Sequence, residues 1–338
     1  MRRPSAFPVT SRRLRSRPLD GPRRQVLLVL AWAAAVALAV LVAVRALGAE
    51  RGTAMALLVG GLPLTLLPAY ALVVLALLWR RRLLTALALA LVLAHLLVVA
   101  PALGAAPVPA AAAAAPRLRV VVSNLYVLNP DPAEAGRALR RLDADVVVVP
   151  ELDARGMRGL QRSGLLEDLP HVVAELGHRS ETVGLLSRLP LSDVTTRPVG
   201  GRELPRATVD VDGTPVRLLA EHTLPPLSVF EQLWRAALDD LGEEVAAVDQ
   251  PAVVLGDFNA DRDHAPFRRL LRTGLRDAHD ERGRGLARTF PAWLPVLHLD
   301  HVLVRDGRGG HLVVRDVREV RLPGSDHRTV VADLALLP

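Results

Sequence analysis

The chain has 338 residues, of which 51% are hydrophobic, and it contains no cysteine. The absence of cysteine excludes disulfide frameworks, cysteine-ligated zinc, iron–sulfur clusters and thiol nucleophiles, so a bound metal would need oxygen or imidazole ligands. The net charge of +7 is unevenly placed: the first 116 residues carry 13 arginines against Asp20 and Glu50, whereas the rest is net acidic. The length predicts two or three units, and the basic excess belongs to the N-terminal one.

Three apolar stretches predict transmembrane helices at about 26–44, 54–79 and 83–100, within a membrane segment 25–100. The first is an uninterrupted run of 19 residues, which as a helix spans about 28 Å, close to the hydrocarbon thickness of a bilayer. A cleaved signal peptide is the alternative for this run, but its core is too long and two more stretches follow. Glycines and prolines interrupt the second stretch, which transmembrane helices tolerate when neighbours satisfy the backbone.

The arginine clusters predict the orientation, because cationic flanks are retained on the cytoplasmic side of the membrane. Residues 1–24 form a predicted cytoplasmic tail with eight arginines, and Arg80–Arg82 fill the second loop, whereas the first loop is far less basic. Three crossings then place the C-terminal domain, residues 117–338, outside the cytoplasmic membrane. The Ala- and Pro-rich linker 101–116 predicts a semi-rigid stalk that holds this domain off the bilayer.

His95 is the one histidine in the third apolar stretch. An ionisable group inside a membrane is a functional candidate by default. No charged partner lies in the other apolar stretches, which favours a neutral histidine at a helix contact.

Residues 117–338 combine short β-branched runs with helical periods, which indicates an α/β domain. Asp131 is expected to cap a helix, Asp212-Gly213 predicts a hairpin turn, and one long amphipathic helix is expected from Phe230 to Val245. The runs are too numerous for one small doubly wound sheet, so we expect two packed sheets with helices outside. The predicted strands are Arg119–Ser123, Val146–Val149, Thr182–Ser187, Ala207–Val211, Thr214–Ala220, Ala252–Leu255, His301–Val304 and Thr329–Leu334.

Acidic, amide and imidazole residues recur at the ends of these strands. Each motif is weak alone, because Asp and Asn commonly cap turns. A calcium hand is excluded by Arg262 and Arg268 at positions that need Gly and Glu, and no nucleophile elbow, P-loop or dinucleotide motif occurs. Together the group has the ligands to hold a hard divalent cation and a histidine to move a proton, which suits attack of water on phosphorus. The motifs, in chain order, are Asn124, Glu151, Glu221-His222, Gly256-Asp257-Phe258-Asn259, Leu299-Asp300-His301 and Ser325-Asp326-His327.

In this order the motifs of residues 117–338 resemble the endonuclease/exonuclease/phosphatase (DNase I-like) superfamily. The resemblance implies a four-layer αββα sandwich and a metal-dependent hydrolase of phosphoester bonds that uses Mg²⁺ or Mn²⁺. Glu151 would be the main metal ligand, with Asn124, Asp326 and Asp257 as further ligands. The sequence departs from the family at Pro150, where a glutamine is usual.

The resemblance also implies roles for the remaining residues. Asp257 and Asn259 would bind the scissile phosphate or a second ion and position the water, and Asn124 would also contact substrate. His327, paired with Asp300, would be the general base or a transition-state stabiliser. His222 would be a second phosphate contact or proton donor, with Glu181 as its partner.

The substrate is open from the sequence. The domain is net acidic and poor in aromatic residues, which disfavours nucleic acid, and no protein partner is expected. Three helices followed by an external domain resemble membrane-bound bacterial members of the superfamily, including the actinomycete teicoplanin-resistance type, which suggests a lipid (polyprenyl) pyrophosphate at the outer face of the membrane. The alternatives are a surface-tethered extracellular endonuclease and a non-catalytic envelope binding protein.

Overall fold

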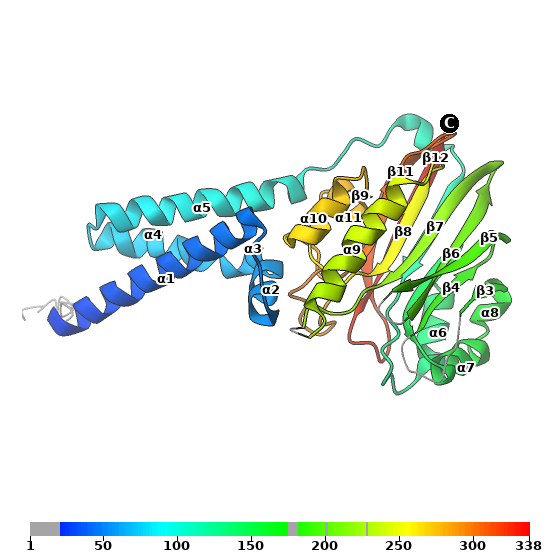
Figure 1. Ribbon diagram of the computed structural model, residues 1–338, viewed down its shortest axis with the longest axis horizontal. Coiled ribbons are helices and arrows are strands. Elements are labelled where there is room, and N and C mark those ends of the chain that lie inside the picture. Colours follow the sequence, from blue (N-terminus) through cyan, green and yellow to red (C-terminus); the bar gives the residue numbers. More distant parts are fainter. Residues whose placement is uncertain (1–20, 175–181, 200–201, 228) are drawn as a thin grey trace, which may run out of the picture.

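The computed structural model describes residues 21–174, 182–199, 202–227 and 229–338. Three apolar helices lie side by side and project away from the C-terminal domain, and two short helices lie between them and the domain (Figure 1). Alanines at the contacts let the helix backbones approach closely, as is usual for helices packed in a membrane. The N-terminal helices are α1 (Gly21–Leu47), α2 (Thr53–Gly60), α3 (Leu62–Thr65), α4 (Pro68–Leu78) and α5 (Arg82–Leu103).

Helices α1 and α5 are each long and apolar enough to cross a membrane. The second apolar stretch is not one straight helix, because the chain bends by 80° between Thr53–Gly60 and Leu62–Leu78. Gly61 and Pro63 explain the break, since glycine weakens the helix and proline removes a backbone donor. The bent pair would be a third span if it crosses as a unit, so the count of three remains a prediction.

His95 is buried in α5, where both ring nitrogens have partners. Its Nδ1 lies 2.9 Å from the Tyr70 hydroxyl oxygen, and its Nε2 lies 3.0 Å from the Pro63 carbonyl oxygen. The Pro63 carbonyl belongs to the bent region, where regular helical hydrogen bonds are interrupted. His95 thus satisfies a polar group that would be costly to leave unpaired in an apolar surrounding.

The linker between the helices and the domain lies against the domain. The Ala106 amide donates to the Glu281 carbonyl at 2.8 Å, and the Gly285 amide donates to the Ala102 carbonyl at 3.0 Å. Ala112, in the 3-10 turn Ala110–Ala113, packs against Val313 and Ala335. The linker therefore does not stand free of the domain as a stalk, because the backbone groups of this apolar stretch find partners on the domain, and the distance of the domain from a bilayer stays a prediction.

The C-terminal domain contains two six-stranded sheets. The first has the order β11-β12-β1-β2-β4-β3 and the second the order β5-β6-β7-β8-β10-β9. The strands are β1 (Arg117–Val122), β2 (Val146–Leu152), β3 (His171–Val173), β4 (Thr182–Ser187), β5 (Leu191–Val199), β6 (Arg202–Val211), β7 (Thr214–His222), β8 (Ala252–Asp257), β9 (Arg276–Asp277), β10 (Asp300–Arg305), β11 (His311–Arg321) and β12 (Arg328–Leu337).

Helices cover the outer face of each sheet and complete four layers. Valine and leucine side chains of both sheets form the central core, which is fully buried. A second core joins the first sheet to α6–α8, and a third joins the second sheet to α9 and α10. The expected αββα sandwich is confirmed. The helices are α6 (Pro132–Arg140), α7 (Ala154–Arg162), α8 (Leu165–Asp168), α9 (Glu231–Ala246), α10 (Ala265–Leu271) and α11 (Ala278–Glu281).

Local sequence signals explain several elements of the domain. The Asp131 side chain accepts from the Glu134 amide at 3.0 Å and caps α6. Asp212 and Gly213 both have positive φ and join β6 to β7, as a two-residue hairpin requires. The amphipathic stripe of α9 is buried from Trp234 to Val245, whereas Phe230 and Leu233 are exposed.

A buried ion pair joins β6 to β7. The Arg206 side chain, 2% exposed, donates to Glu221 at 2.6 Å and to Glu244 of α9 at 2.8 Å. Burial raises the pKa of the Glu221 carboxyl, and the Arg206 guanidinium partly offsets this by lowering it. We expect Arg206→Met to lower the free energy of unfolding by about 3–5 kcal/mol, because Glu221 is left as an uncompensated buried charge. Denaturant unfolding of the full chain, followed by tryptophan fluorescence, measures this.

The matched control is Arg315→Met, because Arg315 is exposed on β11. The double variant Arg206→Met with Glu221→Met should recover stability, since it removes the stranded carboxylate as well. A double variant no more stable than Arg206→Met would contradict the explanation.

Candidate active site

The strand ends deliver polar side chains from both sheets to one edge of the sandwich. Asn124 follows β1, Glu151 lies in β2, Asp257 ends β8, Asp300 begins β10, and Asp326 and His327 precede β12. β1 runs parallel to β2 and antiparallel to β12, whereas β8 runs antiparallel to β10, which explains how ends and beginnings meet at the same edge.

Asn124 links the carboxylates of two different strands. Its side-chain nitrogen donates to Glu151 Oε1 at 3.0 Å and to Asp257 Oδ2 at 3.1 Å. Its oxygen accepts from the Tyr126 amide at 2.9 Å, and Glu151 Oε2 accepts from the Val127 amide at 3.0 Å. The loop after β1 thereby fixes both carboxylates.

His327 is held by a buried carboxylate. Its Nδ1 and Asp300 Oδ2 are 2.8 Å apart, as the sequence led us to expect, and its Nε2 lies 3.8 Å from Asp257 Oδ2. Burial opposes the charged imidazole, but Asp300 and Asp257 outweigh burial and raise the pKa of His327 to about 10. The Nδ1 contact sets the ring orientation and leaves Nε2 facing the rim.

The two remaining predicted residues lie beside Asp257. His222 Nε2 is 4.0 Å from Asp257 Oδ2. The Asn259 amide donates to Asp257 Oδ1 at 2.9 Å, and the Asn259 side chain donates to the Thr223 carbonyl at 2.9 Å. The structure therefore brings together His222, Asp257, Asn259, Asn124, Glu151, Asp300 and His327, with Asp326 adjacent to His327. Glu181 lies outside the described residues, so its pairing with His222 stays a prediction.

Unusual backbone conformations occur at this edge. Glu151 has φ 56°, Asn259 has φ 46° and Tyr126 has φ 63°. Glu151 interrupts the β2–β4 register between Val149 and Leu152. A left-handed glutamate is costly unless the surroundings hold it, and such strain is concentrated at functional sites. At Gly256 a Cβ atom would lie 1.9 Å from the Glu221 carbonyl oxygen, so only glycine lets β7 and β8 pair here.

The donor set fits a divalent cation. Ligand atoms of Asp257, Asp300 and His327 lie within 4.8 Å of one another, a group that shares only Asp257 with the predicted ligand set of Glu151, Asn124, Asp326 and Asp257. Asp300 Oδ1 and Asp326 Oδ1 are buried oxygens without a hydrogen-bond partner among the described residues. Burial and, after it, the nearby Asp300 raise the pKa of Asp257 to about 7, and a bound cation would favour its charged form. Oxygen and imidazole ligands of this kind suit hard divalent metals.

A second buried cluster is formed by side chains of β9, β10, β11 and α11. His301, which belongs to a predicted motif, is not at the active site: its Nδ1 contacts Asp277 at 2.6 Å and its Nε2 contacts the Ala260 carbonyl at 2.9 Å. His279 Nε2 lies 3.0 Å from Glu319 Oε1. Three histidines surround one edge strand, but their spacing in the sequence matches no motif. The sequence alone therefore does not identify the cluster.

The His279–Glu319 pair predicts a pH-dependent stability. Burial opposes both charges, but Asp277 and Glu319 raise the pKa of His279 to about 9, and His279 and Arg284 lower the pKa of Glu319 to about 2. The His279 contribution is complete below its unfolded pKa of 6.5 and is lost as pH rises through about 9. The Glu319 contribution is complete above 4.5 and is lost as pH falls through about 2.

We therefore expect Glu319→Gln to lower the free energy of unfolding by roughly 1.5–3 kcal/mol near pH 6, where both groups are charged. Above about pH 9 the loss should shrink to the part owed to Arg284, which is half exposed and screened by solvent. Denaturant unfolding across pH measures the difference, with exposed Glu243→Gln as control. A loss independent of pH would contradict the pairing.

Comparisons with solved structures agree with the fold of the domain. TDP2 of D. rerio, solved with a single-strand DNA product, has a TM-score of 0.53 at 16% identity, covering 64% of this chain and 98% of that chain. An endonuclease/exonuclease/phosphatase of Beutenbergia cavernae has a TM-score of 0.51 at 21% identity, and the match covers 65% of this chain and 72% of that chain. An endonuclease/exonuclease/phosphatase of Bacteroides vulgatus has a TM-score of 0.53 at 16% identity, and the match covers 65% of this chain and 99% of that chain. No curated protein matches the chain significantly.

The fold and the edge cluster define the class, a metal-dependent hydrolase of phosphoester bonds. The chain belongs to the Endonuclease/Exonuclease/phosphatase family, whose sequence model matches residues 121–327. The match covers most of the domain and runs from β1 to His327.

Proposed function

We propose that the chain hydrolyses a phosphoester or phosphoanhydride bond of a lipid-linked substrate, such as a polyprenyl pyrophosphate, at the outer face of the cytoplasmic membrane. In the pyrophosphate reaction, water attacks the terminal phosphorus and the bond to the bridging oxygen breaks. The products are inorganic phosphate and the lipid monophosphate. Asp257 and Asn259 bind the phosphoryl group or a second ion and position the water, and His222 contacts a second phosphate oxygen or donates a proton.

The proposed roles of the remaining residues are those that the family resemblance implies, and their contacts are consistent with them. Glu151, with Asn124, Asp326 and Asp257, would hold Mg²⁺ or Mn²⁺, which would neutralise charge on the phosphate oxygens. His327 accepts the proton of the attacking water or, when it already carries a proton, stabilises the charge of the transition state. Asp300 keeps the imidazole oriented for either task.

The observation that carries the proposal is where the N-terminal helices contact the domain. These helices, residues 21–103, are called the membrane anchor, and they dock beside the loop after β8 that contains Asp257 and Asn259. Arg45, at the end of α1, pairs with Asp263 at 2.7 Å. The buried Glu50 accepts from the Ala265 amide at 2.7 Å, and Arg235 contacts the Glu50 carbonyl. Residues 263–265 directly follow the loop that contains Asp257 and Asn259. These contacts support an active site held close to the membrane surface.

The distribution of arginines supports the outer face. Arg23 and Arg24 lie near the start of α1, Arg80 and Arg81 lie between α4 and α5, and Arg82 begins α5. All lie at the end of the helices far from the domain (Figure 1). Arginine-rich ends are retained in the cytoplasm. The domain docks on the opposite end, which favours an extracytoplasmic position.

The test is phosphate release from a polyprenyl pyrophosphate in detergent by the full-length protein, with Mg²⁺ or Mn²⁺ and with EDTA, beside nicking of a supercoiled plasmid. Lipid turnover that is lost in EDTA is expected. Nicking without lipid turnover would favour the tethered nuclease, an alternative suggested by the DNA complex of D. rerio TDP2. Activity on neither substrate would leave a non-catalytic binding protein as the alternative.

The orientation has an independent test. A protease added outside intact spheroplasts should cleave the C-terminal domain but leave the N-terminal tail intact. Protection of the domain would place it in the cytoplasm and contradict the outer-face proposal.

A further inference from the structure

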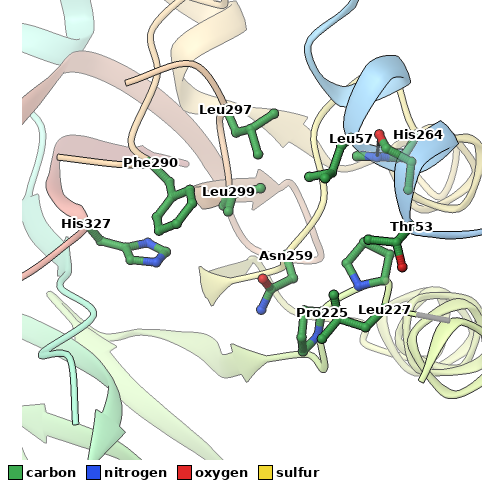
Figure 2. Close-up of a pocket in the computed structure, with 12 residues that line it drawn as sticks. Thr53, Leu57, Pro225, Leu227, Asn259, His264, Phe290, Leu297, Leu299 and His327 are labelled. Carbon is green, nitrogen blue, oxygen red and sulfur yellow. Dashed lines mark hydrogen bonds between the residues drawn. The ribbon is translucent and has the colours of Figure 1, made fainter. Parts of the chain in front are cut away.

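A cavity of about 260 Å³ lies between the catalytic residues and the membrane anchor. Figure 2 shows His327 and Phe290 at one end, Asn259 near the middle, and Thr53 and Leu57 of α2 at the other end. The Phe290 and His327 rings are 4.8 Å apart, so the apolar wall begins directly at the catalytic imidazole. The anchor thus forms part of a cavity that reaches the active site.

The wall of this cavity is apolar apart from a few groups. Leucine and proline side chains from the loops 225–227 and 297–299 face Ala56 and Leu57. His264 also lines the cavity, but both its ring nitrogens are engaged, by the Asp261 amide at 2.8 Å and the Ala56 carbonyl at 2.9 Å. Because Nδ1 accepts from the Asp261 amide, it carries no proton, and burial lowers the pKa of His264 in the same sense. Among the described residues that line the cavity none is an arginine, so His327 is the one group there whose raised pKa favours a positive charge, and the cavity lacks the row of cations that a nucleic-acid backbone requires.

The outer end of the cavity is open toward the anchor. Leu57 and Leu227 line the cavity and are also 52% and 44% exposed. α2 is bent by 80° from the helix that follows it, so its leucines lie at the level where the anchor meets the domain. An apolar opening in this position suits a hydrocarbon chain that continues into a bilayer.

We infer that this cavity binds the hydrocarbon chain next to the phosphate of the substrate, and that α2 is part of the substrate site. The inference rests on the function proposed above. The occupant is a single isoprenoid chain, whose phosphate end lies at His327 and Asn259 and whose chain leaves between Leu57 and Leu227. The cavity is smaller than the roughly 300–1,000 Å³ that enclose a whole small ligand, so it holds only the first isoprene units.

Chain length tests this assignment in the full-length protein in detergent, with pyrophosphates of one and of three isoprene units. Each buried methylene is worth roughly a factor of four in affinity, so kcat/KM should rise at least about tenfold with the longer chain. Leu57→Asn and Leu227→Asn should lower kcat/KM for the longer chain about tenfold and change it for the shorter chain less than about twofold.

Two matched controls distinguish an effect of the cavity from a general effect of removing an exposed apolar side chain. Leu58 on α2 and Leu233 on α9 are 45% and 53% exposed but do not line the cavity. Leu58→Asn and Leu233→Asn should leave kcat/KM for both substrates within about twofold of the value for the unaltered protein. Equal losses for both chain lengths, or equal losses in the controls, would overturn the inference while leaving the hydrolysis of lipid pyrophosphate intact.

A binding measurement keeps the two proposals apart. A three-isoprene pyrophosphate with a diazirine on its second isoprene unit should label peptides that contain Leu57 or Leu227, and Leu57→Asn should reduce this labelling. Labelling elsewhere overturns the chain site. Labelling at these peptides without hydrolysis of either pyrophosphate would support the cavity and overturn the proposed reaction.

Discussion

Replacing His327 by alanine is expected to lower the rate of phosphate release about 10²–10⁴-fold, with folding preserved. The imidazole is fixed by Asp300 at 2.8 Å and faces Asp257, and no other described histidine has this combination of contacts. Its loss removes the group that handles the proton or the developing charge. The measurement is kcat at saturating metal, with thermal unfolding to confirm that the variant folds.

Two variants sharpen this expectation. His311→Ala is the matched control, because His311 is half exposed and pairs with Asp306 far from the rim. Asp300→Asn keeps the shape but removes the charge that orients the ring, and should cost about 10–100-fold in kcat with a shifted pH profile. If His327→Ala kept more than about a tenth of the activity, or if His311→Ala lost as much, His327 would not be catalytic.

The strand pattern was largely predictable, because valine and leucine runs can only be buried between packed layers. The predicted run Thr182–Ser187 matches β4, and most other runs differ from the observed strands by a few residues at the ends. The long edge strand β11 was missed because charged residues alternate with its valines on the exposed side. β5 was missed because most of it is exposed, so its sequence shows no apolar period.

The candidate site was predictable because strand ends carry the polar residues to one edge. The pairing of Asp300 with His327 required only that β10 begin beside the turn before β12. Contacts between distant segments could not be predicted in this way. Glu50 was interpreted only as part of a weakly charged loop, although a lone acidic residue next to a membrane helix is a signal for a buried partner, here Arg235 and the Ala265 amide.

The contribution of α2 to the cavity could not be predicted from the sequence either. It depends on the bend at Gly61 and Pro63 and on the close approach of Gly60 to His264. A Cβ atom at Gly60 would lie 2.8 Å from His264 Cε1. Glycines and prolines indicate that a helix breaks, but the direction of the 80° bend is set by tertiary contacts.

Glu151→Gln is expected to weaken Mg²⁺ or Mn²⁺ binding about 100-fold or more and to lower activity at limiting metal to the same extent. The carboxylate is held by the Asn124 side chain at 3.0 Å and by the Val127 amide at 3.0 Å, and its backbone is left-handed. Glutamine keeps the size of the side chain but removes the charge that attracts the cation. Metal-concentration curves of phosphate release, with calorimetric binding of each metal, measure the change.

The shape of those curves decides between two explanations of a loss in Glu151→Gln. If Glu151 is the main ligand, raising the metal concentration should restore part of the activity, because the remaining oxygens of Asp257 and Asp326 still offer ligands. If Glu151 only supports the loop after β1 through Val127, activity should stay low at every metal concentration while metal affinity is unchanged. Glu134→Gln on the exposed face of α6 is the control, since its carboxylate contacts only Arg137 and should alter neither quantity.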